Sequence, residues 1–340
     1  MRKPLLKGLL VDWHDEKLRG VSVLVTGGLG FIGSNVACRL ADLGADVLAV
    51  DAMMANCGGN LANIAGYEDR IKVDRTDLSQ DANLDRLVEG RQIILNCAGR
   101  VAHYDSMVNP IADLDSNVVA QVNLLEACRR SAPQAAIVFT STRQIYGKPQ
   151  NLPVDEQHPL RPVDVNGINK LASEHYHQLY HDIHGLHVVS LRLTNTFGPR
   201  MRIKDARQTF LGVWLRAVVE ERSFEVWGGD QLRDFSYIDD VVEAMLLAAT
   251  VSACWGQIYN IGGTPPVSLL ALAEQLVQIA GTGRFERKVF PAERKAIDIG
   301  DYFADDTKFR RATDWSPKWS LEAGLAAALD YYRRYLDCYV

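Results

Sequence analysis

The chain has 340 residues, of which 47% are hydrophobic and 23% are charged, ordinary values for a globular protein with a well-buried core. Its 37 basic and 42 acidic residues leave a net charge of −5, and no block of Lys and Arg is long enough to follow a phosphate backbone, which argues against a nucleic-acid partner. No apolar run approaches the roughly 20 residues of a membrane span, no signal-peptide core is visible, and the six cysteines lack the spacing of a zinc site, so we expect a cytoplasmic protein with no membrane segment and no metal.

Strands and helices are expected to alternate along the first part of the chain, after a short amphipathic extension at 1–20. Apolar runs rich in Val, Ile and Leu predict strands buried on both faces of a parallel sheet, at 21–26, 45–50, 91–96, 136–141 and 187–193. Helical patterns lie between them, at 31–43, 81–89, 118–130 and 168–184. This alternation predicts an α/β fold, a Rossmann-type doubly wound sheet over 21–195.

Beyond residue 195 the pattern is looser and predicts a smaller lobe over 196–340 that binds the substrate. The expected elements are helices at 210–220, 238–250 and 321–335 and a strand at 223–227. Short segments such as 257–261 are expected to return to the large sheet.

A glycine-rich turn follows the first predicted strand and opens a helix. Gly27, Gly30 and Gly33 stand in G-x-x-G-x-x-G spacing, which permits a tight turn, lets amide groups approach a pyrophosphate, and lets the helix close on the strand. Asp51 ends the next strand, where a carboxylate bonds the adenosine ribose hydroxyls. Because a carboxylate repels a 2′-phosphate and no arginine stands at 52–54, the pattern favours NAD over NADP. Asp77 and Leu78 fit an adenine contact or a helix N-cap equally well.

Further motifs make the chain resemble the extended short-chain dehydrogenases/reductases, specifically the NAD-dependent sugar-nucleotide epimerase/dehydratase family, from residue 21 to about 336. The motifs are Asn96-Cys97-Ala98-Gly99, Asp115-Ser116-Asn117, Ser141-Thr142-Arg143-Gln144-Ile145-Tyr146-Gly147, Lys170, the run 192–200 and the run 233–240. The resemblance implies bound NAD and a homodimer formed through the stretches 118–130 and 168–184. It implies cofactor contacts from Gly27, Gly30, Phe31, Ile32, Gly33, Asp51, Asp77, Leu78, Cys97, Ala98, Gly99, Asn117 and Lys170.

The resemblance also implies a catalytic Ser/Thr, Tyr and Lys, and one of the three is replaced here. Thr142 and Lys170 match, but the residue four before the lysine is Asn166, which cannot act as a general base. A relocated base is one explanation, with His103 or Tyr104 favoured. The others are that Lys170 or a water on Thr142 moves the proton while Asn166 holds the sugar, or that the site has lost its chemistry.

Substrate contacts are expected from the resemblance at Arg100, Thr142, Asn195, Arg233, Lys295 and Asp298, with Arg233 clamping the diphosphate of a nucleotide sugar and Asp234 holding that arginine in place. The family's dehydratases carry an Asp-Glu pair where Arg143 and Gln144 stand, and neither of these can deliver a proton at neutral pH. An epimerase acting at C4 of a UDP-linked hexose is therefore the leading hypothesis. A catalytically silent NAD and sugar-nucleotide binder, and a dehydratase or dehydrogenase of the same family, are the alternatives.

Overall fold

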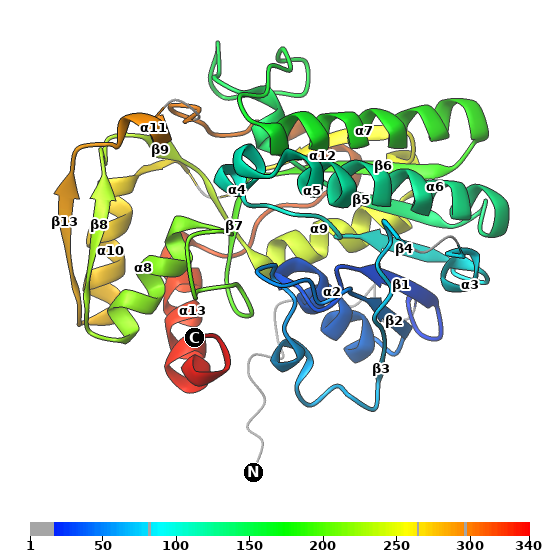
Figure 1. The fold of residues 1–340 in the computed structure, drawn as a ribbon, viewed down its shortest axis with the longest axis horizontal. Coiled ribbons are helices and arrows are strands. Elements are labelled where there is room, and N and C mark those ends of the chain that lie inside the picture. The colour runs from blue at the N-terminus through cyan, green and yellow to red at the C-terminus, as the bar shows by residue number, and fades with distance from the viewer. Residues whose placement is uncertain (1–16, 81–82, 264, 296–297) are drawn as a thin grey trace.

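A seven-stranded parallel sheet organises the larger part of the molecule (Figure 1). The computed structural model describes residues 17–80, 83–263, 265–295 and 298–340, so the expected extension at 1–20 lies almost entirely outside the described residues. The strands follow the order β11-β6-β5-β4-β1-β2-β3 and comprise Ser22–Thr26 (β1), Asp46–Val50 (β2), Ile71–Asp74 (β3), Ile93–Asn96 (β4), Ala136–Thr142 (β5), His187–Leu193 (β6) and Gln257–Ile261 (β11).

Helices cover both faces of this sheet, which is why its strands are apolar without alternation. α2 (Phe31–Asp42) and α9 (Ile238–Thr250) pack on one face, and α3 (Asp85–Val88), α6 (Ala120–Ser131) and α7 (Val165–His184) lie on the other. α7 begins three residues earlier than expected because Asp164 caps it, accepting a hydrogen bond from Gly167 N at 2.6 Å.

The expected helix at 118–130 is the end of a longer helical stretch that forms one wall of the site. It comprises α4 (His103–Val108), α5 (Pro110–Leu114), a π-helical turn at Asp115–Val119 and then α6. Asn109 caps α5 through Ala112 N at 3.2 Å, and the proline occupies the first helical position, where its missing N–H is no loss. The residues 103–105, expected in a loop, therefore form the first turn of a helix.

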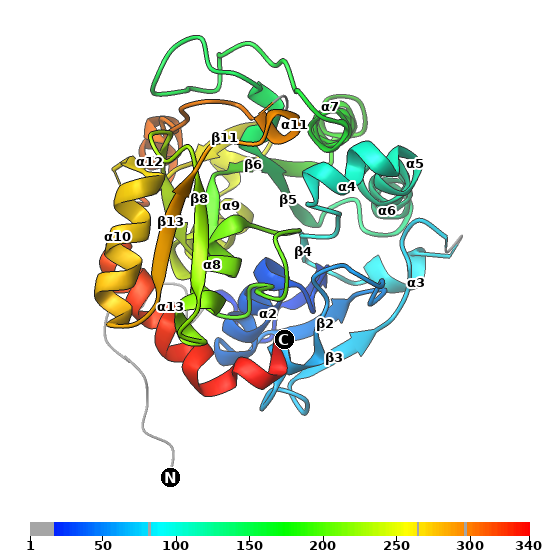
Figure 2. The ribbon, with the colours of Figure 1, turned by 60° about the vertical axis from the view of Figure 1, so that its left-hand side comes forward.

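The smaller lobe is built from three two-stranded pairings and a layer of helices (Figure 2). β7 (Asn195–Phe197) pairs with β10 (Phe235–Tyr237), β8 (Ser223–Trp227) with β13 (Arg284–Lys288), and β9 (Leu232–Arg233) with β12 (Val267–Ser268). The helices are α8 (Phe210–Val219), α10 (Leu269–Ala280), α11 (Ala292–Lys295) and α13 (Leu321–Tyr335), whereas α12 (Thr307–Thr313) packs against β11 of the large sheet. β11 leaves this part of the chain and joins the large sheet beside β6.

None of the helices in the described ranges combines the length and apolar character that crossing a bilayer demands. The same ranges contain no group of three or more His, Cys, Asp or Glu side chains arranged to hold a metal ion.

Candidate active site

A cavity of about 1200 Å³ opens at the carboxyl ends of the sheet strands, against the smaller lobe. In an open α/β sheet this is where ligands bind, next to the point at which strand order reverses, here between β1 and β4. Among the described residues predicted to act in catalysis or to contact the cofactor or substrate, only Asn117 and Lys295 do not line this cavity. Those that do are Gly27, Gly30, Phe31, Ile32, Gly33, Asp51, Asp77, Leu78, Cys97, Ala98, Gly99, Arg100, His103, Tyr104, Thr142, Asn166, Lys170, Asn195, Arg233 and Asp298.

The glycine-rich turn forms a cradle that leaves no room for side chains. Gly27 has a φ of +62°, and a Cβ on it would lie 2.7 Å from the carbonyl oxygen of Cys97. A Cβ on Gly33 would lie 2.1 Å from the carbonyl oxygen of Gly27. Gly28, for which we predicted no role, is equally tight, since its Cβ would lie 2.6 Å from that of Ala49. Because α2 begins directly after Gly30, its free amide groups face the cavity, a geometry suited to a pyrophosphate.

Asp51 stands directly after β2 and lines the cavity beside this cradle. Its carboxylate accepts hydrogen bonds from Leu29 N at 3.1 Å and Met53 N at 2.9 Å, which fix its orientation. Burial raises its pKa, and these amides oppose that rise. Asp77 caps no helix, since it accepts from Ser79 N at 2.9 Å within a turn before α3. Of the two roles expected for Asp77, only the cofactor contact remains open.

Asn117 lies behind the cavity wall with one polar atom unsatisfied. Its amide nitrogen donates to Arg100 O at 3.2 Å and to Asp113 Oδ1 at 3.1 Å, whereas its Oδ1 is buried and has no partner in the described part of the chain. A Cβ on Gly99 would lie 2.4 Å from that oxygen and 3.2 Å from Lys170 Nζ, so only glycine fits between them. A cradle closed to side chains, a fixed carboxylate and an unpartnered acceptor together fit a dinucleotide such as NAD.

Thr142 and Lys170 come from neighbouring elements of the large domain. Thr142 ends β5, and its Oγ1 accepts from Gln144 N at 3.2 Å. Lys170 projects from α7 and donates to Thr140 O at 3.0 Å, with its ammonium 4.8 Å from the centre of the Phe139 ring. Burial lowers the pKa of Lys170 to about 8, so a substantial fraction of this amine is neutral slightly above physiological pH.

Asn166 is held by Asp113, a buried carboxylate that the sequence reasoning missed. The Asn166 side-chain nitrogen donates to Arg100 O at 2.8 Å and to Asp113 Oδ2 at 3.0 Å. Asn169 and Asn117 donate to the other oxygen of the same carboxylate, at 2.8 and 3.1 Å. Both amide hydrogens of Asn166 are thereby used, so it offers the cavity an acceptor, Oδ1, and no donor.

His103 and Asp164 form a second unanticipated arrangement on the same wall. His103 Nδ1 lies 3.0 Å from Asp164 Oδ2, the distance of an ion pair, although the angle is outside the range of a directed hydrogen bond. Asp164 is 1% exposed and also accepts from Gln144 Nε2 at 3.0 Å. Burial opposes its ionisation, yet His103 and the neighbouring donors keep the pKa of Asp164 below its usual range. Tyr104, next along the chain, lines the cavity but is 42% exposed.

At the other end of the cavity, Arg233 is buried and its partner is not the one expected. Its guanidinium donates to Asp298 at 3.0 Å, whereas Asp234 accepts from Ala304 N. Adjacent residues of an extended segment point to opposite sides, so Asp234 cannot hold its neighbour, and the expectation that it does is wrong. Asn195 lines the cavity nearby. Lys295 is exposed at the end of α11, so the structure does not place it at the expected position beside the substrate phosphate.

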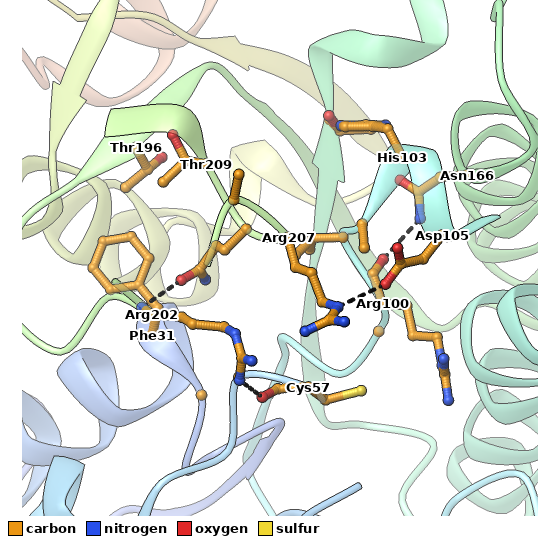
Figure 3. A pocket seen from close by; sticks show the side chains of 18 of the residues that line it. Phe31, Cys57, Arg100, His103, Asp105, Asn166, Thr196, Arg202, Arg207 and Thr209 are labelled. Carbon is orange, nitrogen blue, oxygen red and sulfur yellow. Dashed lines mark hydrogen bonds and ion pairs between the residues drawn. The ribbon is translucent and has the colours of Figure 1, made fainter. Parts of the chain in front are cut away.

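A segment of the smaller lobe reaches across the cavity to the large domain (Figure 3). Arg202 donates to the carbonyl oxygen of Cys57 at 2.9 Å, and Arg207 pairs with Asp105 of α4 at 2.9 Å. Both arginines also bind Asp205. In Figure 3, His103 and Asn166 lie on the wall opposite Arg202. They are linked through Ser106, whose hydroxyl accepts from Asn166 N and donates to His103 O.

Comparison with known proteins identifies close structural counterparts of this architecture. The profile of the NAD dependent epimerase/dehydratase family matches residues 23–262. The UDP-glucose 4-epimerase of Mycolicibacterium smegmatis is 28% identical over 313 residues, which cover 91% of this chain and 98% of that protein. A UDP-glucose 4-epimerase structure from Thermotoga maritima, solved with UDP-glucose, is 26% identical with a TM-score of 0.85 and covers 93% of this chain and 100% of that one. The UDP-glucuronic acid 4-epimerase of Bacillus cereus, solved with UDP-glucuronic acid and NAD, is 26% identical with a TM-score of 0.81 and covers 92% and 99%.

Proposed function

Because this chain belongs to the NAD-dependent epimerase/dehydratase family, we propose that it is an epimerase that inverts a ring carbon of a nucleotide-diphosphate sugar. UDP is the favoured nucleotide and C4 the favoured carbon, since the relatives described above are named as 4-epimerases of UDP-sugars. When bound, NAD supplies a reversible acceptor for the hydride that leaves the sugar ring. The observation that carries the proposal is that the dinucleotide cradle and the residues Thr142, Lys170 and Arg233 line one cavity.

Epimerisation is favoured over dehydration by the two residues that follow Thr142. Eliminating water needs one group to donate a proton and another to accept one. Arg143 cannot give up its proton near neutral pH, and Gln144 is an amide committed to Asp164. Epimerisation needs only one base beside the cofactor.

In this proposal His103 is the base that takes the proton of the sugar hydroxyl. An Asp164 carboxylate facing Nδ1 favours the tautomer with the proton on that nitrogen, which leaves Nε2 as an acceptor. Asn166 contributes Oδ1, which accepts a hydrogen bond from a sugar hydroxyl and so fixes the ring. Asp164 and Gln144 are positioning residues, since they act through His103.

Lys170 is the second candidate for the base. Its lowered pKa of about 8 makes a neutral amine available, and it lines the same cavity. Tyr104 is the third, because a phenol mimics the tyrosine that the family ordinarily carries. The three candidates differ in which substitution abolishes the chemistry, and they can be separated with single variants.

The test is to incubate the purified protein with UDP-, GDP-, CDP- and dTDP-sugars while following product stereochemistry and nicotinamide absorbance. A new epimer without net NADH is expected. Net NADH would instead identify a dehydrogenase, and ligands that bind without turnover would establish the silent alternative and overturn the proposal.

The base is tested with His103→Gln, Tyr104→Phe, Asn166→Ala and Lys170→Met. His103→Gln is expected to reduce kcat by about 10²- to 10⁴-fold, more than any of the other three. Asp164→Asn should move the acidic limb of the pH profile, a change that a merely structural role would not produce. If Asn166→Ala is the more damaging change, the relocation of the base to His103 is wrong.

We also propose that the protein works in the cytoplasm as a homodimer. All six cysteines are free thiols, the state expected in a reducing compartment. α7 exposes Ile168, Leu179 and Ile183, at 54%, 50% and 68%, along one side of the helix, which is an apolar surface suited to a second copy. Sedimentation should give a dimer, and Leu179→Glu with Ile183→Glu should give a monomer. A wild-type monomer at micromolar concentration would contradict the proposal.

A further inference from the structure

Arg143 is a cation of the cavity whose hydrogen-bonding capacity is left partly unused. It directly follows Thr142, lines the cavity, and places its guanidinium 5.8 Å from the centre of the Tyr302 ring. Its Nε is buried and has no hydrogen-bond partner among the residues that the structure describes. Since a guanidinium has only donors, the group that satisfies this nitrogen must be an acceptor.

Among the described residues, the other arginines along the cavity have carboxylate partners, except Arg100, whose Nε donates to Ser116 Oγ at 3.3 Å. Arg202 lies 2.5 Å from Asp205, and Arg233 lies 3.0 Å from Asp298. Within the described part of the chain, no carboxylate lies at ion-pair distance from Arg143. The anion that stabilises it most is Asp234, followed by Asp298 and Asp164 at longer range.

Asp234 does not occupy the ligand side of Arg143. Asp234 is buried and is not among the residues that line the cavity, and its Oδ1 is also without a partner. A ligand in the cavity therefore meets Arg143 from another side. Burial of the guanidinium lowers its pKa, and the nearby anions oppose that shift.

We propose that Arg143 binds a carboxylate on the sugar ring, so that the substrate is a nucleotide-diphosphate hexuronic acid. This inference rests on the proposed function, since it assumes a sugar nucleotide with its reacting carbon beside Thr142. For reaction at C4, the carboxyl group of a hexuronic acid is attached to the adjacent ring carbon, within reach of the residue that follows Thr142. A carboxylate accepts paired hydrogen bonds from the planar guanidinium fork and neutralises its charge. The hydroxymethyl group of a neutral hexose leaves the charge uncompensated.

The first test uses the unaltered protein with NAD and a matched pair of ligands, UDP-glucuronate and UDP-glucose, which differ only at C6. Calorimetry should show UDP-glucuronate binding about 10- to 100-fold more tightly, the range for a hydrogen-bonded charge pair. Equal affinity, or tighter UDP-glucose, would overturn the inference. Because this measurement needs no turnover, a preference for the acid together with no epimerisation would refute the proposed function and leave only the contact between Arg143 and the carboxylate standing.

The second test assigns the preference to Arg143. Arg143→Gln should reduce affinity for UDP-glucuronate by about 10- to 100-fold and change that for UDP-glucose by less than about threefold. Arg143→Lys should retain part of the preference, because it keeps the charge and loses the fork. Arg334→Gln, on the exposed side of α13, is the matched control and should leave both affinities unchanged. If Arg143→Gln weakens both ligands equally, Arg143 only supports the cavity wall and the inference is wrong.

Discussion

Adding a single methyl group at Gly33 is expected to disable the dinucleotide cradle by displacing backbone. An alanine Cβ there would lie 2.1 Å from the carbonyl oxygen of Gly27 and 3.0 Å from the Cα of Gly28, where an ordinary contact needs at least 3.4 Å. The turn and α2 must therefore separate by about 1 Å, and overpacking that moves backbone typically costs about 1–3 kcal/mol, occasionally more. We expect Gly33→Ala to lower the free energy of unfolding by about 2–4 kcal/mol and to abolish NAD binding.

Gly30→Ala is the matched comparison, because it adds the same methyl group one helical turn earlier. Gly30 has a φ of −76°, which alanine adopts without strain, and its Cβ would meet only the carbonyl oxygen of Gly27, at 3.2 Å. Stability should stay within about 1 kcal/mol of the wild type, while the methyl group keeps the pyrophosphate from the amide groups. Urea denaturation without cofactor and calorimetric titration with NAD measure the two effects. Wild-type stability and wild-type NAD affinity in Gly33→Ala would refute the argument from close approach.

Three further predictions concern buried charge and cofactor choice. Burial lowers the pKa of His177 to about 4, so the unfolded chain takes up a proton at this position before the folded protein does. The free energy of unfolding should therefore fall by about 3 kcal/mol as the pH drops from about 6.5 to 4. His177→Gln should make the urea midpoint depend less on pH over that range. Arg192 and Glu174 form a buried ion pair at 2.6 Å, so Arg192→Met leaves Glu174 buried without a cation and should lower the free energy of unfolding by about 3–5 kcal/mol. Adding Glu174→Leu to that variant should restore most of this loss. No recovery in the double variant would mean that the loss is not electrostatic. Asp51→Ala should weaken NAD binding and relieve the repulsion of NADP, so the Kd for NADP divided by the Kd for NAD should fall toward one. A wild type that binds both cofactors equally would contradict this role of Asp51.

The regular parts of the fold could be predicted because their sequence signals are local. Buried apolar runs and a glycine-rich turn can be recognised without knowing which residues they contact in the folded protein. The predicted Rossmann-type fold, family and NAD dependence are confirmed. The ends of helices were less accurate. Asn109 followed by Pro110 marks the start of α5, which leads into α6, and Asp164 marks the start of α7, but neither signal was used. α3 is shorter than the helix expected at 81–89, whose residues 81 and 82 lie outside the described ones.

The residues that organise the site were harder to foresee, since their partners are distant in the chain. Asp113 belongs to no recognised motif, and it meets Asn166 only because α5 packs on α7. Asp164 likewise meets His103 only in the folded state. Residue type identified His103 as a candidate base, but only the three-dimensional structure shows the carboxylate beside it.

The Asp113 cluster also limits how this site can evolve. Exchanging Asn166 for the tyrosine usual in the family would take a donor from a buried carboxylate that now accepts from three asparagines. The incoming phenol would face an anion, which raises the pKa of a phenol and keeps it protonated. Positions 113 and 166 are therefore coupled: a tyrosine at 166 becomes useful only when the carboxylate at 113 has been neutralised as well, so two exchanges are needed and neither suffices alone.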